Sequence, residues 1–167
     1  MWDATLAVHV VAGTVALVAG AVAIAAPKRR GVHTRTGEVY HAAVLTVCVS
    51  AAVLSVLRWD SLWWFLPIAA GSYAFALLGY AAAKLRRANW LRRHVSGMGG
   101  SYIAMTTALL VVNWRNITGE NGVQSPWAWA LPTLIGTPLL SIVRRRLTRS
   151  RGRQSGTART ATPPPAA

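Results

Sequence analysis

The chain has 167 residues, of which 53% are hydrophobic and 13% are charged, and its formal net charge is +14. Because soluble domains carry about a quarter charged residues, this composition excludes an ordinary soluble domain, and it is also too apolar for a disordered chain. A single cysteine excludes a disulfide framework and a cysteine-rich metal site, which leaves a nucleic-acid-binding protein or a membrane protein with its basic residues on one side.

Five long stretches contain no Asp, Glu, Lys or Arg, at about residues 4–26, 39–57, 62–83, 94–114 and 127–143. They predict membrane-spanning helices, because a helix of about 20 residues crosses a bilayer and satisfies its own backbone hydrogen bonds there. The fifth stretch is short and contains Pro132 and Pro138, so we expect it to be bent or partly interfacial. The predicted fold is all-α, an integral membrane helical bundle of five transmembrane helices over residues 1–143.

Most basic residues follow the first, third and fifth of these stretches, and few follow the second and fourth. Sixteen of the eighteen Lys and Arg fall within residues 27–38, 84–93 and 144–167, and the other two are Arg58 and Arg115. Since an excess of Lys and Arg marks cytoplasmic loops, we predict an N-terminus outside and a C-terminus inside a plasma (inner) membrane. Seven of the eight tryptophans fall near the outer ends of the predicted spans, as interfacial anchors do.

Residues 144–167 are basic at first and then rich in Ser, Thr, Pro and Gly. Such a segment buries little apolar area, so we predict a disordered cytoplasmic tail. The tail and the basic loops are expected to attract anionic lipid head groups, each basic residue contributing about 1 kcal/mol near the surface. We expect no nucleic-acid binding, because no aromatic residue is interleaved with the basic residues of the tail to stack on bases.

Histidines are the main candidates for chemistry, because the predicted loops are too short for a catalytic domain. His9 lies within the first predicted span, where a polar ionisable group costs enough to be a site hypothesis. Gly13, Ala16 and Gly20 continue the same helical face, which leaves room for a flat ligand. The interpretation that we favour for His9 is a neutral imidazole hydrogen-bonded across an interface of small residues.

His41 and His94 are predicted at similar depth on two different spans, near the cytoplasmic side. Neutral imidazoles from two helices can ligate one haem iron from opposite sides. Arginines nearby suit the carboxylate groups of haem b, namely Arg30, Arg35, Arg92 and Arg93. A structural role for both histidines, another metal and another small ligand are the alternatives, and His33 is expected to be a solvated residue of the basic loop.

Two segments resemble a family of bacterial polytopic membrane proteins that is catalogued as a domain of unknown function. The first is His9 with Gly13, followed by HTRTGEVY at residues 33–40, which is similar to that family's loop of His, Arg, Gly and Tyr. The second is HVSGMGGSYIAMTTALLVVN at residues 94–113, followed by Leu131 and Pro132. The resemblance covers most of residues 5–140 and implies a bundle of several membrane helices. It implies no reaction, because the activity of that family is not established.

Two functions therefore remain open. The first is a small membrane binding or interaction module, whose partner would be another membrane protein or a second copy of the chain. The alternative is a haem-b-binding or other redox membrane protein that uses His41 and His94, with His9 as a further site. Whether the chain is an enzyme is left open, although the sequence contains neither His-Glu-x-x-His nor a Ser, His and acid constellation.

Overall fold

The computed structural model describes residues 1–28 and 31–160, with side chains as far as Leu147. Over this part of the chain all secondary structure is helical: α1 (Trp2–Ala25), α2 (Val32–Leu57), α3 (Trp59–Leu62), α4 (Phe65–Leu85), α5 (Trp90–Thr118) and α6 (Pro126–Thr160). Within the described residues, five helices are long and apolar enough to cross a membrane, and α3 is too short. The predicted all-α bundle of five candidate spans is confirmed.

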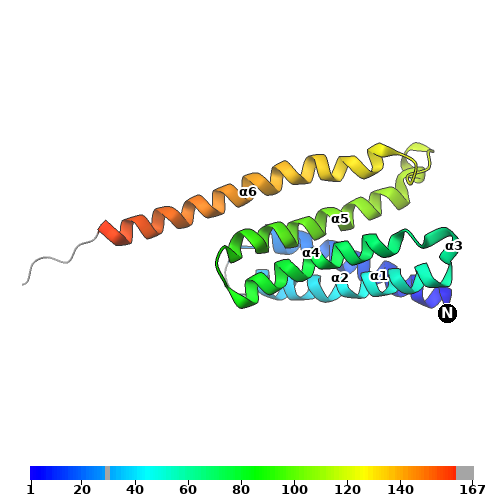
Figure 1. The fold of residues 1–167 in the computed structure, drawn as a ribbon, viewed down its shortest axis with the longest axis horizontal. Helices are drawn as coiled ribbons and strands as arrows, with labels where there is room; N and C mark the ends of the chain where they lie inside the picture. Colours follow the sequence, from blue (N-terminus) through cyan, green and yellow to red (C-terminus); the bar gives the residue numbers. More distant parts are fainter. Residues whose placement is uncertain (29–30, 161–167) are drawn as a thin grey trace, which may run out of the picture.

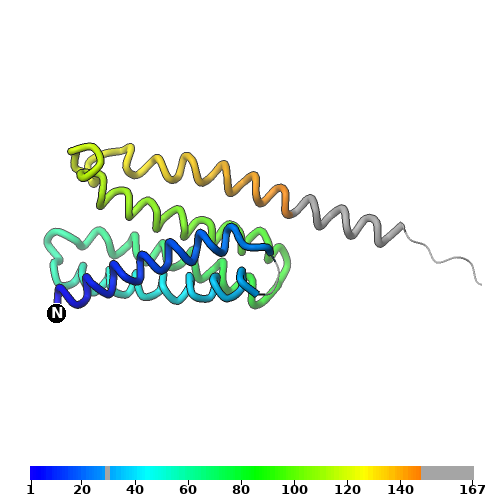
Figure 2. The backbone as a smooth tube through the Cα atoms, turned by 180° about the vertical axis from the view of Figure 1, so that it is seen from behind, coloured from blue at the N-terminus to red at the C-terminus, as the bar shows by residue number. Residues whose placement is uncertain are grey.

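Helices α1, α2, α4 and α5 form a four-helix bundle (Figure 1). α1 packs along α2, α2 along α4 and α4 along α5, and a smaller contact between α1 and α5 closes the ring. α6 packs mainly against α5 and lies on the outside of the bundle, as Figure 2 shows from behind. Two ends result: the basic end holds the α1–α2 and α4–α5 connections, and the tryptophan end holds Met1 and the α2–α4 and α5–α6 connections.

The core between these helices consists of small side chains. Ala16 of α1, Val44 of α2 and Ala76 of α4 are each 0% exposed and belong to one buried cluster. Lipid tails are as apolar as these side chains, so moving a side chain from lipid into the core gains little from the hydrophobic effect. Small residues instead let the backbones approach closely and gain van der Waals contact.

Two tyrosines connect the helices of the core by hydrogen bonds. The Tyr40 hydroxyl lies 2.7 Å from Ser101 Oγ, and it is the donor because Ser101 already donates to a backbone carbonyl of its own helix. Tyr102 OH donates to the Leu17 carbonyl at 3.2 Å. The ring of Tyr102 fills the space beside Gly20, where a Cβ atom would lie 2.5 Å from its Cε2. These contacts tie α1 and α2 to α5.

Two helices, α2 and α5, begin well before the charge-free stretches that predicted them. α2 begins at Val32, seven residues before the predicted start, and so includes much of the predicted basic loop 27–38. α5 begins at Trp90, four residues early. Charged side chains limit the part of a helix that lies in lipid, but they do not end the helix, since its backbone hydrogen bonds continue outside the bilayer. Thus the Arg35 N–H already donates to the Gly31 carbonyl at 3.0 Å.

Helix α6 extends beyond its apolar part. It runs as one helix through Pro132 and Pro138 and continues to Thr160. The disorder expected of the tail from Arg144 stays a prediction. Residues 161–167 of the predicted tail, and Arg29 and Arg30 of the basic loop, lie outside the described residues.

Candidate functional site

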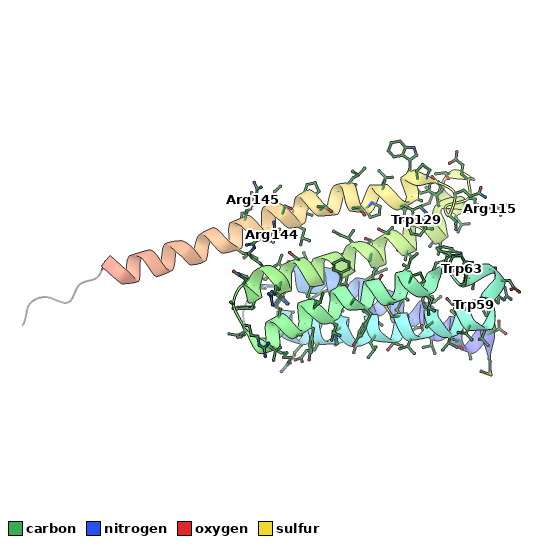
Figure 3. The ribbon with its side chains drawn as sticks, in the orientation of Figure 1. Trp59, Trp63, Arg115, Trp129, Arg144 and Arg145 are labelled. Carbon is green, nitrogen blue, oxygen red and sulfur yellow. The ribbon has the colours of Figure 1, made fainter. Side chains whose placement is uncertain are left out.

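Basic side chains gather at the basic end of the bundle, with Arg144 and Arg145 of α6 beside it (Figure 3). The described basic residues of this end are Lys28, Arg35, Lys84, Arg86, Arg87, Arg92, Arg93, Arg144, Arg145 and Arg146. One acidic residue, Glu38, accompanies them, and its Oε1 lies 2.7 Å from Lys84 Nζ. The chain's other three acidic residues belong to the tryptophan end, so the basic end keeps a strong positive excess.

The tryptophan end combines few charges with exposed aromatic rings. Trp59 and Trp63 are 55% and 54% exposed, as expected for anchors at a membrane interface (Figure 3). The guanidinium of Arg58 lies 4.0 Å from the centroid of the Trp2 ring, which joins the start of α1 to the end of α2. Trp114 differs, because it is buried in a small cluster with Val111 of α5 and Ala128 of α6.

His94 lies in the second turn of α5, at the basic end. Its Nδ1 is 2.9 Å from the Gly79 carbonyl oxygen of α4. Because a carbonyl only accepts, Nδ1 carries the proton, and the lone pair of the neutral ring is on Nε2. α4 and α5 approach closely here, since a Cβ on Gly79 would lie 2.5 Å from Met98 N and one on Gly97 would lie 2.5 Å from Gly79 N. The two glycines therefore bring the acceptor carbonyl to His94.

His33 lies in the first turn of α2 and is half-buried, so the expectation of a solvated loop residue is wrong. Its Nδ1 donates to the Ala23 carbonyl of α1 at 2.9 Å. The centroid of its ring lies 6.2 Å from that of His94, and the ring planes make an angle of 86°. Lys28 Nζ donates to the same Ala23 carbonyl at 2.9 Å, and partial burial lowers the pKa of Lys28. The sequence analysis missed His33 because it assigned residues 27–38 to a loop.

His41 faces a different part of the bundle. Its ring stacks on Tyr80 of α4, with centroids 4.1 Å apart and planes at 14°. Its Nε2 is buried and has no hydrogen-bond partner among the described residues. The ring neighbours of His94 are His33 and Trp90 instead. Within the described part of the chain, no ring contact joins His41 to His94, the pair proposed from the sequence.

His9 of α1 contacts Ser50 of α2 in the interior of the bundle. The distance from His9 Nδ1 to Ser50 Oγ is 3.0 Å. Ser50 donates its own hydroxyl proton to the Thr46 carbonyl at 2.7 Å, so it accepts from His9. The contact is a hydrogen bond between two packed helices, which agrees with the structural role that we favoured for His9.

The arginines proposed from the sequence to bind carboxylates lie at the basic end. Arg35 is exposed on α2, two residues after His33, and Arg93 is exposed on α5, directly before His94. Both positions suit contact with an anionic group that approaches the basic end from outside the bundle.

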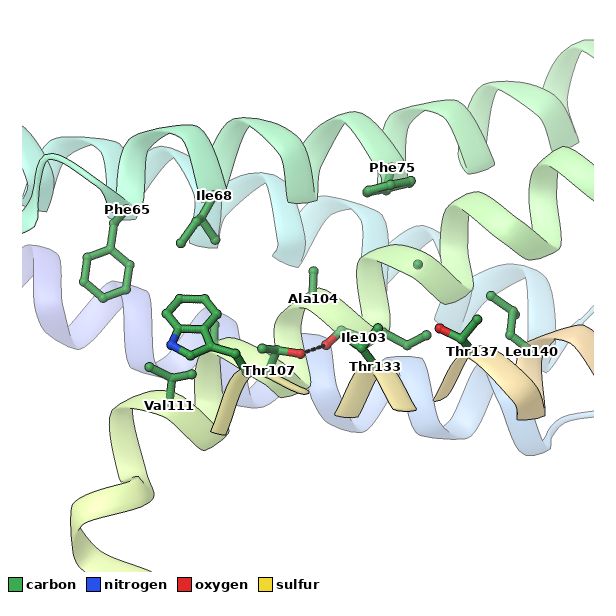
Figure 4. A pocket seen from close by; sticks show the side chains of 13 residues that line it. Phe65, Ile68, Phe75, Ile103, Ala104, Thr107, Val111, Thr133, Thr137 and Leu140 are labelled. Carbon is green, nitrogen blue, oxygen red and sulfur yellow. Dashed lines mark hydrogen bonds between the residues drawn. The ribbon is translucent and has the colours of Figure 1, made fainter. Parts of the chain in front are cut away.

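A groove of about 380 Å³ runs between α4, α5 and α6 (Figure 4). Its walls include Phe65, Ile68 and Phe75 of α4, which face Ile103 of α5. The Thr107 hydroxyl in this groove donates to the Ile103 carbonyl at 2.8 Å, within its own helix. None of the side chains that line the groove titrates, so its chemistry matches that of lipid hydrocarbon.

Comparison with known proteins places the chain in a family. No curated protein and no solved structure matches it. The model of the family described as "Predicted membrane protein (DUF2306)" matches residues 6–142, which include all the histidines discussed above and the apolar part of α6. The chain, a multi-pass membrane protein by its five candidate spans, therefore belongs to the DUF2306 family of predicted membrane proteins.

Proposed function

We propose that this protein is a multi-pass membrane binding module whose basic end binds anionic phospholipid head groups at the cytoplasmic face of the plasma membrane. The observation that carries the proposal is the segregation of charge along the bundle. The described part of the basic end holds ten Lys and Arg residues and one acidic residue, which is already paired with Lys84. In a membrane, the phosphate groups of anionic lipids attract such a positively charged surface.

The geometry of the basic end supports this function. Arg87 is exposed in the α4–α5 connection, Arg92 is exposed in the first turn of α5, and Arg35 is exposed in the first turn of α2. Side chains of this length reach the head-group layer when the apolar helices span the hydrocarbon. The attraction is electrostatic, so it should weaken as the ionic strength rises.

The test compares two double variants that remove equal charge from opposite ends. Arg87→Gln with Arg92→Gln removes two charges from the basic end, and Arg58→Gln with Arg115→Gln removes two from the tryptophan end. At about 1 kcal/mol for each residue, the first pair should weaken binding roughly thirtyfold, and the second should leave it unchanged. Native mass spectrometry of the purified protein with phosphatidylglycerol and phosphatidylcholine in competition measures the preference. Equal losses in both variants, or no preference in the wild type, would refute the proposal.

The haem function considered from the sequence required His41 and His94 as a pair. His41 stacks on Tyr80, and His94 has His33 and Trp90 as its ring neighbours. No observation favours the pair His41 and His94, so we do not propose it.

A further inference from the structure

His33 and His94 have the same arrangement at the basic end. Each ring donates from Nδ1 to a backbone carbonyl at 2.9 Å, His33 to Ala23 and His94 to Gly79. The two histidines are on α2 and α5, and their acceptors are on α1 and α4, so all four helices of the bundle hold this pair. A backbone acceptor at one nitrogen fixes the tautomer and orientation of an imidazole and leaves the other nitrogen as a metal ligand.

The spacing between the rings fits a metal held from opposite sides. With metal–nitrogen bonds of about 2.0 Å and roughly 1.1 Å from each nitrogen to its ring centre, two opposite imidazoles have centroids about 6.2 Å apart. Two ligands of a tetrahedral metal would have centroids only about 5 Å apart. The centroids of His33 and His94 are 6.2 Å apart. The 86° between the ring planes is compatible, since each ring turns about its own metal–nitrogen bond.

The set of protein ligands for a metal at this place is small. Among the described residues, no group of three or more His, Cys, Asp or Glu side chains could hold a metal ion. A metal bound here must therefore bring its other ligands with it, as a haem iron does with its four porphyrin nitrogens.

The same region offers space and charge for such a flat group. Gly37 lies one turn after His33 on the same face of α2 and is half-buried, yet a Cβ added there would meet nothing within 4 Å. Lys28 lies beside His33, with both side chains bonded to the Ala23 carbonyl, and Arg93 directly precedes His94. These cations suit the two carboxylate groups of haem.

We propose that His33 and His94 are the two axial ligands of a haem iron at the basic end of the bundle, each binding through Nε2. The site does not depend on lipid binding. Compared with the ligand pair proposed from the sequence, His94 is retained and His33 takes the place of His41.

The test is the absorbance spectrum of the full chain, expressed with haem supply and purified in detergent, and of the same protein titrated with hemin. The wild type should bind one equivalent and show the sharp reduced bands of six-coordinate low-spin haem. His33→Ala and His94→Ala should each lose that spectrum, whereas the matched controls His41→Ala and His9→Ala should keep it. A wild type that binds no haem overturns the proposal, as does a spectrum lost in His41→Ala and kept in His33→Ala.

A second variant separates ligation from a structural role of His33. Methionine is an axial haem ligand that raises the reduction potential. His33→Met should therefore still bind haem, with a changed spectrum and a raised potential, and the size-exclusion profile of each variant checks its fold. An unchanged spectrum and potential in His33→Met would contradict the proposal. So would a wild type that is saturated by one equivalent of Zn²⁺ or Cu²⁺ and fails to take up hemin.

Discussion

The contact between Gly79 and Gly97 makes a quantitative prediction about how α4 and α5 pack. In Gly79→Ala the new Cβ would lie 2.5 Å from Met98 N and 2.9 Å from the carbonyl carbon of Gly97. Both of these are backbone atoms, so no side chain can turn away to make room. The two helices must separate by about 1 Å to restore ordinary contact, and overpacking of this kind costs about 1–3 kcal/mol.

Two smaller effects accompany this separation. The Gly79 carbonyl moves away from His94 Nδ1, which it now meets at 2.9 Å, and the loss of such a bond costs about 0.5–1.5 kcal/mol. Alanine regains about 0.5–1 kcal/mol through its higher helix propensity. The packing cost is the largest of the three, so we expect Gly79→Ala to lower the free energy of unfolding by about 2 kcal/mol.

Gly71 provides the matched control on the same helix. It is exposed, and a Cβ there would meet nothing within 4 Å, so Gly71→Ala should be neutral or slightly stabilising. Equilibrium unfolding by SDS in mixed micelles, followed by circular dichroism, measures both variants. The reasoning is refuted if Gly79→Ala unfolds at the same SDS fraction as Gly71→Ala.

Further predictions follow from single contacts and from the charge pattern. Tyr40→Phe removes the 2.7 Å bond to Ser101 and should lower the free energy of unfolding by about 1 kcal/mol in the same SDS titration; no change would mean that this bond does not stabilise the bundle. His41→Phe keeps a ring against Tyr80 and removes a buried nitrogen that lacks a partner, so it should raise that free energy by about 1 kcal/mol, and a loss would point to an unseen partner of His41. A reporter fused after Ala167 should report the cytoplasm, and an exterior signal would contradict the N-out, C-in orientation.

The number and type of the long helices could be predicted because they depend on the thickness of the bilayer, which is nearly fixed. A bilayer sets how many uncharged residues a span needs, and that number is visible in the sequence. The ends of the helices could not be predicted in this way, because charge limits the apolar part and not the helix. For α2 the error was seven residues, and it placed His33 in a loop.

Which histidines lie next to each other depends on the direction in which each side chain points from its helix. Hydropathy gives no information about that direction. His33 and His41 are eight residues apart on α2, which is about 80° around the helix and about 12 Å along it. This rotation turns His33 toward His94 and His41 toward Tyr80. The sequence indicated the approximate depth of each histidine, but the direction in which it points is decided by which helices pack together.

The position of α6 has a consequence for the order in which the protein assembles. α1, α2, α4 and α5 complete their mutual contacts within residues 1–118, and α6 joins afterwards, mainly through α5. During synthesis the four-helix unit, with His33 and His94 in place, can therefore form in the membrane before α6 has been inserted. A chain that stops at residue 125 keeps every contact among these four helices, so loss of α6 should leave a folded core.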